Sequence, residues 1–363
     1  MNKLHLYLAN LDHNFGLIRK QLSSNTAIFG VVKAWAYGSD MIKIAKRLEQ
    51  IGVDYLAVAY AEEGKILREE GINIPILVFY PQIKGLQTII DYKLEPSLYS
   101  TLLLEKFRCI LKEKKSKHYP VHIKYNTGLN RVGFNPNQTN WILEQFKEEE
   151  FDLKTVYSHL ATSESSENKT NNSKQIKTFL ALKKQHEDDA NSNPKFHLLN
   201  SSGIFKNTKY EFDAVRCGIA LHGFSNYPHL DQKLKPLASL HTIISQIHMV
   251  KKGDNVGYDL GWKAPKDSII ATLPIGHADG IGRYFGNEKA RVSVNGISAP
   301  IVGNVCMDMI MIDVSGISCK EEDIVVVFGP EHNASECAMS AGTMRYDVLS
   351  GIGSRVMHII HSL

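Results

Sequence analysis

The sequence lacks the features that mark membrane, secreted or zinc-binding proteins. It has an odd number of cysteines and no Cys-x-x-Cys pair, at Cys109, Cys217, Cys306, Cys319 and Cys337. This pattern argues against both a disulfide framework and a zinc site. No apolar stretch is long enough to span a bilayer, and no apolar signal region follows Met1. We therefore expect a reduced, cytoplasmic protein with no metal and no membrane partner.

An excess of charge of one sign is also absent. The sequence has 42 lysine and arginine residues against 38 aspartate and glutamate residues, a net charge of +4. This excess is too small to indicate a nucleic acid as partner. The 363 residues are 43% hydrophobic and 22% charged, which is an ordinary globular composition with room for two domains. A small molecule is the expected partner.

The first part of the chain alternates apolar runs with polar stretches of helical spacing. Eight runs have strand character, at 28–33, 53–59, 74–80, 94–99, 120–126, 153–161, 195–201 and 214–221. Met41, Ile44, Ala45 and Leu48 illustrate the helical spacing between them. The alternation predicts an α/β fold, a (β/α)₈ TIM barrel, preceded by a helix at about residues 11–22.

The pattern changes after about residue 230. Short strand-like runs separated by Gly, Asn and Asp turns then follow, at 237–250, 269–274, 290–294, 310–314 and 324–328. We predict a barrel domain over residues 1–230 and a mainly β domain over residues 231–363. A stretch rich in Ser, Glu, Asn and Lys at residues 163–173 is expected to be a solvated loop.

Lys33 follows directly after the first predicted strand, within the sequence VVKAWAYG at residues 31–38. Desolvation lowers the pKa of a lysine, and the neutral amine that results can attack a carbonyl to form a Schiff base. A lysine that extends its charge out of a strand end is an equally good interpretation of these residues alone.

Further polar residues stand at the ends of the predicted strands, where TIM barrels carry their catalytic groups. They are Lys33, Tyr37, Lys124, Arg131, His159, Asn200, Ser201 and Arg216. Singly, His159 fits a core histidine and Ser201 a helix N-cap. Because so many polar groups share one end of one barrel, we expect them to converge in a site.

Two Gly-containing segments suggest a phosphate site at the same end of the barrel. Ser201-Ser202-Gly203 and Cys217-Gly218-Ile219 follow the last two predicted strands, where many barrels bind phosphate. A lysine nucleophile with a phosphate cradle indicates pyridoxal phosphate. A Schiff-base aldolase that acts on a sugar phosphate is the alternative from the same residues.

Eight segments in order then give a specific resemblance. They are 31–38 (VVKAWAYG), 124–133 (KYNTGLNRVG), 158–162 (SHLAT), 200–201 (NS), 216–223 (RCGIALHG), 276–280 (GHADG), 302–308 (VGNVCMD) and 346–356. Over nearly its whole length the chain resembles the alanine racemase family, whose members are pyridoxal-phosphate enzymes with a barrel and a β domain. The resemblance implies a homodimer that interconverts L- and D-alanine for peptidoglycan synthesis.

The resemblance also implies roles for individual residues. The two catalytic bases would be Lys33, which also binds the cofactor covalently, and Tyr258, supplied by the neighbouring subunit. Taken alone, Tyr258 fits a β-sheet aromatic residue. The other implied cofactor contacts are Tyr37, His159, Ser201, Arg216, Gly218, Ile219 and Tyr346. The implied substrate contacts are Arg131, Met307, Asp308 and His277, and Lys124 matches a lysine that is carbamylated in some members.

Three residues depart from the family pattern. Trp35 stands where the family has asparagine, and it would reshape the back of the cofactor site. His222 and His277 replace tyrosines, the second at the substrate entrance, where a histidine changes the charge near neutral pH. These departures leave a racemase of another small amino acid, such as serine, as an alternative.

Two related functions fit less well. An amino-acid decarboxylase of similar fold would have a glutamate in place of Arg216 and an acidic or cysteine residue in place of Tyr258. A non-enzymatic pyridoxal-phosphate carrier would lack the second domain.

Overall fold

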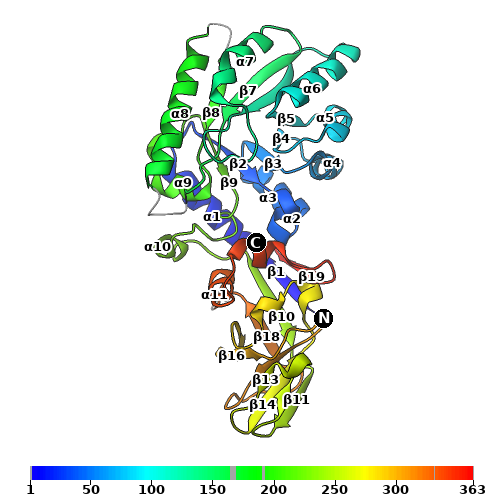
Figure 1. Cartoon of the computed structure of the whole chain (residues 1–363). Coiled ribbons are helices and arrows are strands. Elements are labelled where there is room, and N and C mark those ends of the chain that lie inside the picture. The colour runs from blue at the N-terminus through cyan, green and yellow to red at the C-terminus, as the bar shows by residue number, and fades with distance from the viewer. Residues whose placement is uncertain (1, 164–168, 190–192, 331, 363) are drawn as a thin grey trace.

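The computed structural model describes residues 2–163, 169–189, 193–330 and 332–362. Figure 1 shows a barrel surrounded by helices at one end of an elongated molecule and a β domain at the other. In the same view the C label lies where the two parts meet, and the N label lies beside the β domain.

The barrel is a closed, parallel sheet of eight strands, as predicted. The strands are β2 (Ala27–Val31), β3 (Tyr55–Val58), β4 (Ile76–Val78), β5 (Glu95–Leu98), β6 (Tyr119–Lys124), β7 (Phe151–Tyr157), β8 (Lys195–His197) and β9 (Ala214–Cys217). The ring closes where β9 pairs with β2, Ile28 lying opposite Val215. Several of the predicted strands are longer than the observed strands, because the residues at their ends already belong to the turns that lead to the helices.

Helices alternate with the strands and cover the outside of the barrel. They include α1 (Leu8–Gln21), α3 (Met41–Gln50), α4 (Ala61–Glu69), α5 (Leu86–Asp91), α6 (Thr101–Glu113), α7 (Thr139–Gln145), α8 (Lys169–Glu187) and α9 (Ser201–Lys206). In α3 the four apolar residues of the predicted spacing are all buried. The Asp40 carboxylate caps this helix by accepting from the amide of Lys43 at 2.9 Å.

The loop predicted over residues 163–173 is wrong in its second half. Residues 164–168 lie outside the described part of the chain, but α8 already begins at Lys169. Ile176, Phe179 and Leu182 of the same helix are buried against the barrel. Packing of this apolar side stabilises the whole helix, including its polar first turn. An argument from composition alone cannot anticipate this.

The β domain is built on a sheet of nine described strands in the order β11-β14-β17-β16-β15-β18-β10-β1-β19. Their bounds are β1 (Lys3–Tyr7), β10 (Ala238–Ile243), β11 (Gln246–Val250), β14 (Ser268–Leu273), β15 (Arg291–Val294), β16 (Ile297–Val302), β17 (Ile310–Asp313), β18 (Ile324–Phe328) and β19 (Met357–His361). The sequence did not indicate β1, which pairs with β10 and β19. The first residues of the chain therefore belong to the sheet of the second part.

Each part has its own apolar core. One cluster fills the space between the barrel and its helices, and another lies within the β domain. All five cysteines are free. Among the described residues, no helix combines the length and the apolar character that crossing a membrane requires.

Candidate active site

A cavity of about 240 Å³ lies at the C-terminal ends of the barrel strands. All eight polar residues that the sequence places at strand ends line it, together with Gly218, Ile219 and Tyr346. Val31, Phe79, Tyr80 and Tyr157 complete the described lining. An engineered cavity of about 150 Å³ is enough to hold benzene, so this one has room for a substituted aromatic ring.

Lys33 enters the cavity because the chain turns left-handed directly after it. In α2 (Lys33–Gly38) the four residues Ala34 to Tyr37 all have φ between 51° and 56°. A left-handed conformation costs about 1–2 kcal/mol for each such residue. Strain of this kind persists only where surrounding contacts hold it, and it is concentrated at functional sites.

The carboxylate of Glu63 helps to hold this left-handed turn in place. It accepts from the amide of Ala34 at 2.6 Å and from the amide of Ala59 at 2.7 Å. The same carboxylate therefore ties the first residue of the turn to the end of β3. Glu63 also favours the charged form of Lys33, but burial and the charge of Arg131 are stronger, and they lower the pKa of that lysine.

Four basic side chains share the cavity: Lys33, Lys124, Arg131 and Arg216. None of the described residues that line it is aspartate or glutamate. Burial and the neighbouring cations, Arg131 first among them, lower the pKa of Lys124 to about 7. The cavity is therefore suited to an anionic ligand.

The guanidinium of Arg216 is fixed at the floor of the cavity by neutral acceptors. Its Nη1 donates to Nδ1 of His197 at 2.6 Å, and its Nη2 donates to the carbonyl of Ser158 at 2.7 Å and of Leu198 at 3.0 Å. Burial lowers the pKa of Arg216 to about 10, which leaves it charged at neutral pH. Its Nε–H has no partner among the described residues, so a ligand in the cavity can accept from it.

His159 completes the surroundings of this guanidinium. Its Nδ1 lies 3.3 Å from Nη2 of Arg216. Burial and the nearby cations, Arg216 foremost, hold the pKa of His159 well below its ordinary value. The ring is therefore a neutral acceptor that orients the arginine.

The turn after β9 brings together the hydroxyl and amide groups from which the sequence suggested a phosphate site. The Ser201 hydroxyl accepts from the amides of Gly218 at 3.0 Å and Ala220 at 3.2 Å, whereas the intervening amide of Ile219 has no partner among the described residues. A Cβ on Gly218 would lie 2.1 Å from the hydroxyl oxygen of Tyr37. Hydroxyls and a spare amide thus meet in a space that only glycine leaves open, as a phosphate group requires.

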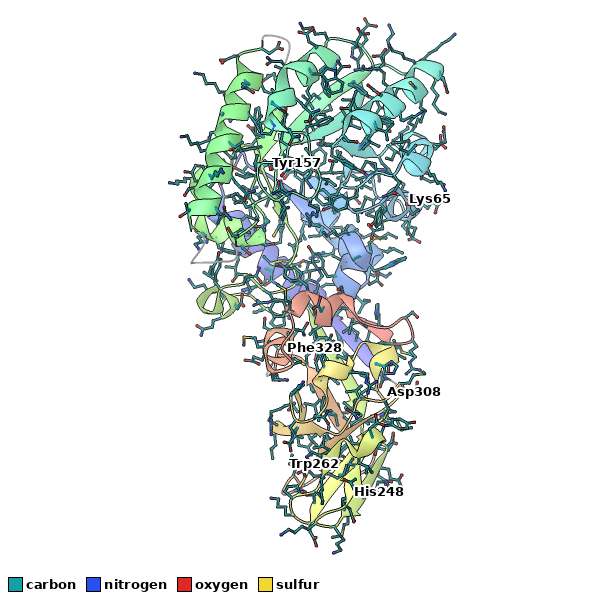
Figure 2. All side chains as sticks on the ribbon, in the orientation of Figure 1. Lys65, Tyr157, His248, Trp262, Asp308 and Phe328 are labelled. Atoms are coloured by element: carbon teal, nitrogen blue, oxygen red, sulfur yellow. The ribbon has the colours of Figure 1, made fainter. Side chains whose placement is uncertain are left out.

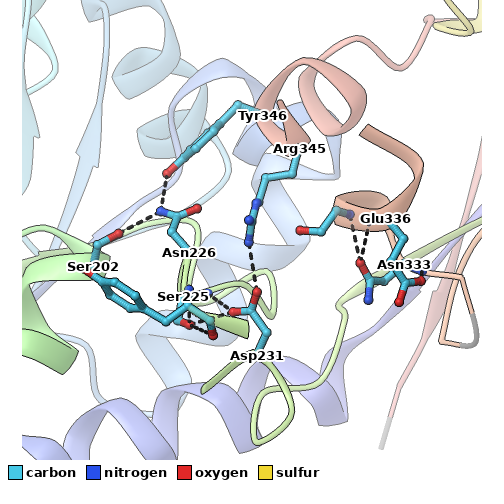
Figure 3. A network of polar contacts seen from close by, with 10 residues as sticks. Ser202, Ser225, Asn226, Asp231, Asn333, Glu336, Arg345 and Tyr346 are labelled. Atoms are coloured by element: carbon cyan, nitrogen blue, oxygen red, sulfur yellow. Dashed lines mark hydrogen bonds and ion pairs between the residues drawn. The ribbon is translucent and has the colours of Figure 1, made fainter. Parts of the chain in front are cut away.

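Tyr346 reaches the cavity from α12 (Arg345–Ser350), near the end of the chain. Figure 3 shows the contacts that hold it. Asn226 donates to the Tyr346 hydroxyl at 3.4 Å and to the Ser202 hydroxyl at 2.7 Å, and Arg345 pairs with Asp231 at 3.0 Å. This network fastens α12 to the segment that follows the barrel's last strand.

The remaining predicted site residues lie elsewhere in the chain. Tyr258, Met307 and Asp308 line a separate pocket of about 540 Å³ on the β domain, and His277 contacts its wall through its amide, which donates to the carbonyl of Cys306. Figure 2 shows Asp308 on the β domain, well away from Tyr157 in the barrel. The side chains of Tyr258 and Met307 are 70% and 59% exposed. One chain therefore does not bring these residues to the lysine.

The three residues that depart from the family pattern occupy different surroundings. Trp35 is largely exposed in a neighbouring groove and is not among the residues that line the cavity. His222 is buried with its ring 4.8 Å from that of Tyr37, and burial lowers its pKa to about 3. His277 is exposed.

Comparison with known proteins identifies the two parts of the chain. Residues 6–226 match the family model described as the alanine racemase N-terminal domain, and residues 237–360 match that of the alanine racemase C-terminal domain. An alanine racemase of Clostridium kluyveri is 35% identical over 96% of this chain and 91% of its own length. One from Treponema denticola is 33% identical over 98% of this chain and 97% of its own.

Solved structures agree with this assignment. A Clostridium difficile alanine racemase is 33% identical and superposes with a TM-score of 0.90, over 99% of this chain and 95% of that one. The alanine racemase of Bartonella henselae, solved with covalently bound pyridoxal phosphate, is 27% identical with a TM-score of 0.89, over 99% of both chains. The chain belongs to the alanine racemase family.

Proposed function

We propose that this protein is a homodimer that interconverts L- and D-alanine with the help of pyridoxal phosphate, using Lys33 and Tyr258 as two bases. The observation that carries the proposal is the cavity itself. It combines a lysine of lowered pKa, hydroxyl and amide groups beside Gly218, and a surplus of positive charge in one space. A phosphorylated aldehyde and an amino-acid carboxylate are the groups that these features fit.

The residues present fit the cofactor at both of its ends. The phosphate would accept from Tyr37, Ser201, Ile219 and Tyr346, in the space beside Gly218. The unpartnered Nε–H of Arg216 would face the ring nitrogen, and His159 would hold that arginine in place. When bound, the cofactor withdraws electrons from the α-carbon of the amino acid and makes its hydrogen acidic.

Two bases are needed because racemisation removes a proton from one face of the α-carbon and returns one to the other. Lys33 stands on the barrel side of the cavity, and its lowered pKa favours the neutral amine that accepts a proton. Tyr258 would stand on the opposite side, supplied by a second copy of the chain. Its exposed ring, in a pocket bordered by exposed Met307 and Met309, favours an interface there.

The substrate would be held by charge. Arg131 is exposed at the mouth of the cavity, where its guanidinium can pair with the carboxylate of an amino acid. Met307, Asp308 and His277 would border the substrate from the second subunit. Asp308 is already oriented by Arg355, which lies 2.7 Å from its carboxylate and also pairs with the buried Asp279.

Arg216 would direct the reaction toward racemisation. The guanidinium would donate to the ring nitrogen without giving up its proton at neutral pH, so the ring would draw less charge away from the α-carbon. Return of the proton to that carbon is then favoured over transamination. We infer that the D-alanine formed supplies peptidoglycan synthesis, and the five free cysteines fit a reducing cytoplasm.

The test is to incubate the purified protein and pyridoxal phosphate with L-alanine, L-serine and L-glutamate separately in deuterated water. Chiral chromatography with mass detection should show deuterated D-alanine, and Lys33→Ala should form none. Deuterated D-serine as the main product would redirect the proposal to another substrate. No racemisation of any of the three would refute it.

A further inference from the structure

A row of polar side chains crosses the interior of the barrel beneath the cavity. Each comes from a different strand, and the five strands are consecutive in the ring: Glu95 of β5, His122 of β6, Thr155 of β7, His197 of β8 and Arg216 of β9. All are between 0% and 8% exposed. Because branched apolar side chains usually fill a barrel of this kind, such a row calls for an explanation.

The row is a continuous chain of hydrogen bonds. Oε2 of Glu95 lies 2.9 Å from Nε2 of His122, whose Nδ1 lies 2.7 Å from Oγ1 of Thr155. The same threonine oxygen lies 2.8 Å from Nε2 of His197. Nδ1 of His197 then meets Arg216 at 2.6 Å. Both ring nitrogens of each histidine are therefore within hydrogen-bond distance of a neighbour in the row.

The direction of every bond follows from its two ends. Arginine can only donate, so Nδ1 of His197 accepts and the hydrogen of this neutral ring is on Nε2. That hydrogen goes to Thr155, whose own hydroxyl hydrogen is then left for Nδ1 of His122. The hydrogen of His122 is therefore on Nε2 and goes to the carboxylate of Glu95. All four bonds point from the arginine to the glutamate.

This chain of hydrogen bonds joins two buried groups of opposite charge, Arg216 at one end and Glu95 at the other. No aspartate or glutamate among the described residues lies within ion-pair distance of Arg216, although the cation is buried. Glu95 is buried at the far end, where Tyr55 and Arg68 are near enough to sense its charge. A buried ion is costly unless its charge is stabilised by partners. Aligned hydrogen bonds polarise one another, so this row can stabilise both the positive and the negative charge across the barrel.

We propose that Glu95, His122 and Thr155 are positioning residues for Arg216, with the Glu95 carboxylate as its remote counter-ion. The aligned chain holds His197 in the tautomer that accepts from the guanidinium. Arg216 then keeps one orientation, with its Nε–H open to the cavity. The kinetic consequence rests on the proposed function, because only a ligand ring at Arg216 makes that orientation matter for the reaction.

The direction of the hydrogen bonds in the row can be tested without measuring turnover. In the full-length protein labelled with ¹⁵N-histidine, the two rings are assigned from the signals lost in His122→Asn and His197→Asn. We expect both rings to be neutral and protonated at Nε2, each with an exchange-protected N–H proton. A hydrogen on Nδ1 of either ring, or on both nitrogens of one ring, would overturn the proposal.

The middle of the chain offers matched variants. Thr155→Val removes the hydroxyl but keeps the shape, and Thr155→Ser keeps the hydroxyl. In Thr155→Val we expect the protected N–H signal of His197 to disappear and His122 to populate both of its neutral tautomers. In Thr155→Ser we expect the His197 signal and the single His122 tautomer to remain. Unchanged histidine signals in Thr155→Val would show that the hydroxyl does not link the two rings.

The same variants separate positioning from general damage to the fold. Thr155→Val should lower kcat for alanine about tenfold with KM unchanged, and Thr155→Ser should keep the wild-type kcat. Thr242→Val is the control, because Thr242 is also a buried strand threonine, donating to Asn2 at 2.8 Å in the β domain. An equal loss of kcat in this control would refute a specific role for Thr155.

Glu95→Gln tests the counter-ion alone. Glutamine can still accept from His122 but carries no charge. We expect kcat to fall while the tautomers of both histidines stay as they are. Wild-type kcat in this variant would remove the counter-ion from the proposal. If the wild-type protein does not racemise alanine at all, the proposed function fails. The histidine signals would then still test whether the hydrogen bonds from Arg216 to Glu95 form as proposed.

Discussion

Two inactive variants should restore activity to each other if the active site is shared between subunits. In one chain Lys33 lines the barrel cavity, whereas Tyr258 lies in a separate pocket on the β domain. Lys33→Ala removes one base and Tyr258→Phe the other, so each homodimer should be nearly inactive. A dimer with one chain of each kind has one site with both bases and one site with neither.

The size of the recovery follows from this count. Free exchange of equal amounts of the two variants makes half of the dimers mixed, and each mixed dimer has one intact site of two. The mixture should therefore reach about a quarter of wild-type activity, and mixed dimers purified with two affinity tags about a half. Formation of D-alanine, followed by chiral chromatography, measures both values.

The control replaces Tyr258→Phe by the double variant Lys33→Ala/Tyr258→Phe. Mixed with Lys33→Ala, it can form no site with both bases and should give no recovery. If Tyr258 acted within its own chain, every site of the first mixed dimer would also lack one base. No recovery there, with mixed dimers present, would refute the shared site.

Three further predictions concern the cavity. Since the pKa of Lys124 is about 7, about 90% of this amine is neutral at pH 8, and ¹³C-bicarbonate should give a carbamate carbon signal that Lys124→Met lacks. Gly218→Ala should displace the Tyr37 hydroxyl and weaken pyridoxal phosphate binding at least tenfold by absorbance titration, because its Cβ would lie 2.1 Å from that oxygen. The rate at which the protein takes up the cofactor should rise with pH and level off below 10.5, since burial and Arg131 lower the pKa of Lys33, and Arg131→Met should shift the profile upward. An identical pH profile in that variant would contradict this account of the lysine.

The barrel was predictable because parallel strands buried on both faces read as continuous apolar runs. β1 and β19 were not, since KLHLY and MHIIH are short and polar residues interrupt the apolar ones in each. Their pairing also joins Lys3 to Met357, and no local pattern reports a contact over that distance. β16 was obscured by Pro300, which usually indicates an edge strand or a turn.

The residues that line the cavity could also be predicted from the sequence. The rule that functional side chains follow barrel strands brings together Lys33, Lys124 and Arg216 from segments far apart in sequence. It cannot reveal Glu63, which acts on the backbone of the left-handed turn and has no motif of its own. Nor can it reveal the turn, because alanine, tryptophan and tyrosine have no preference for that conformation.

The cavity also contains features that lower the stability of the fold and that only a function would explain. A left-handed turn of non-glycine residues destabilises the protein, and so does the grouping of Lys33, Lys124 and Arg131 in a cavity that no described carboxylate lines. Within the barrel, by contrast, the buried charge of Glu95 is matched through His122 and Thr155. The imbalance is thus confined to the space that an anionic ligand would fill. Packing and folding explain the barrel, but only a bound anion explains why its open end is built from cations.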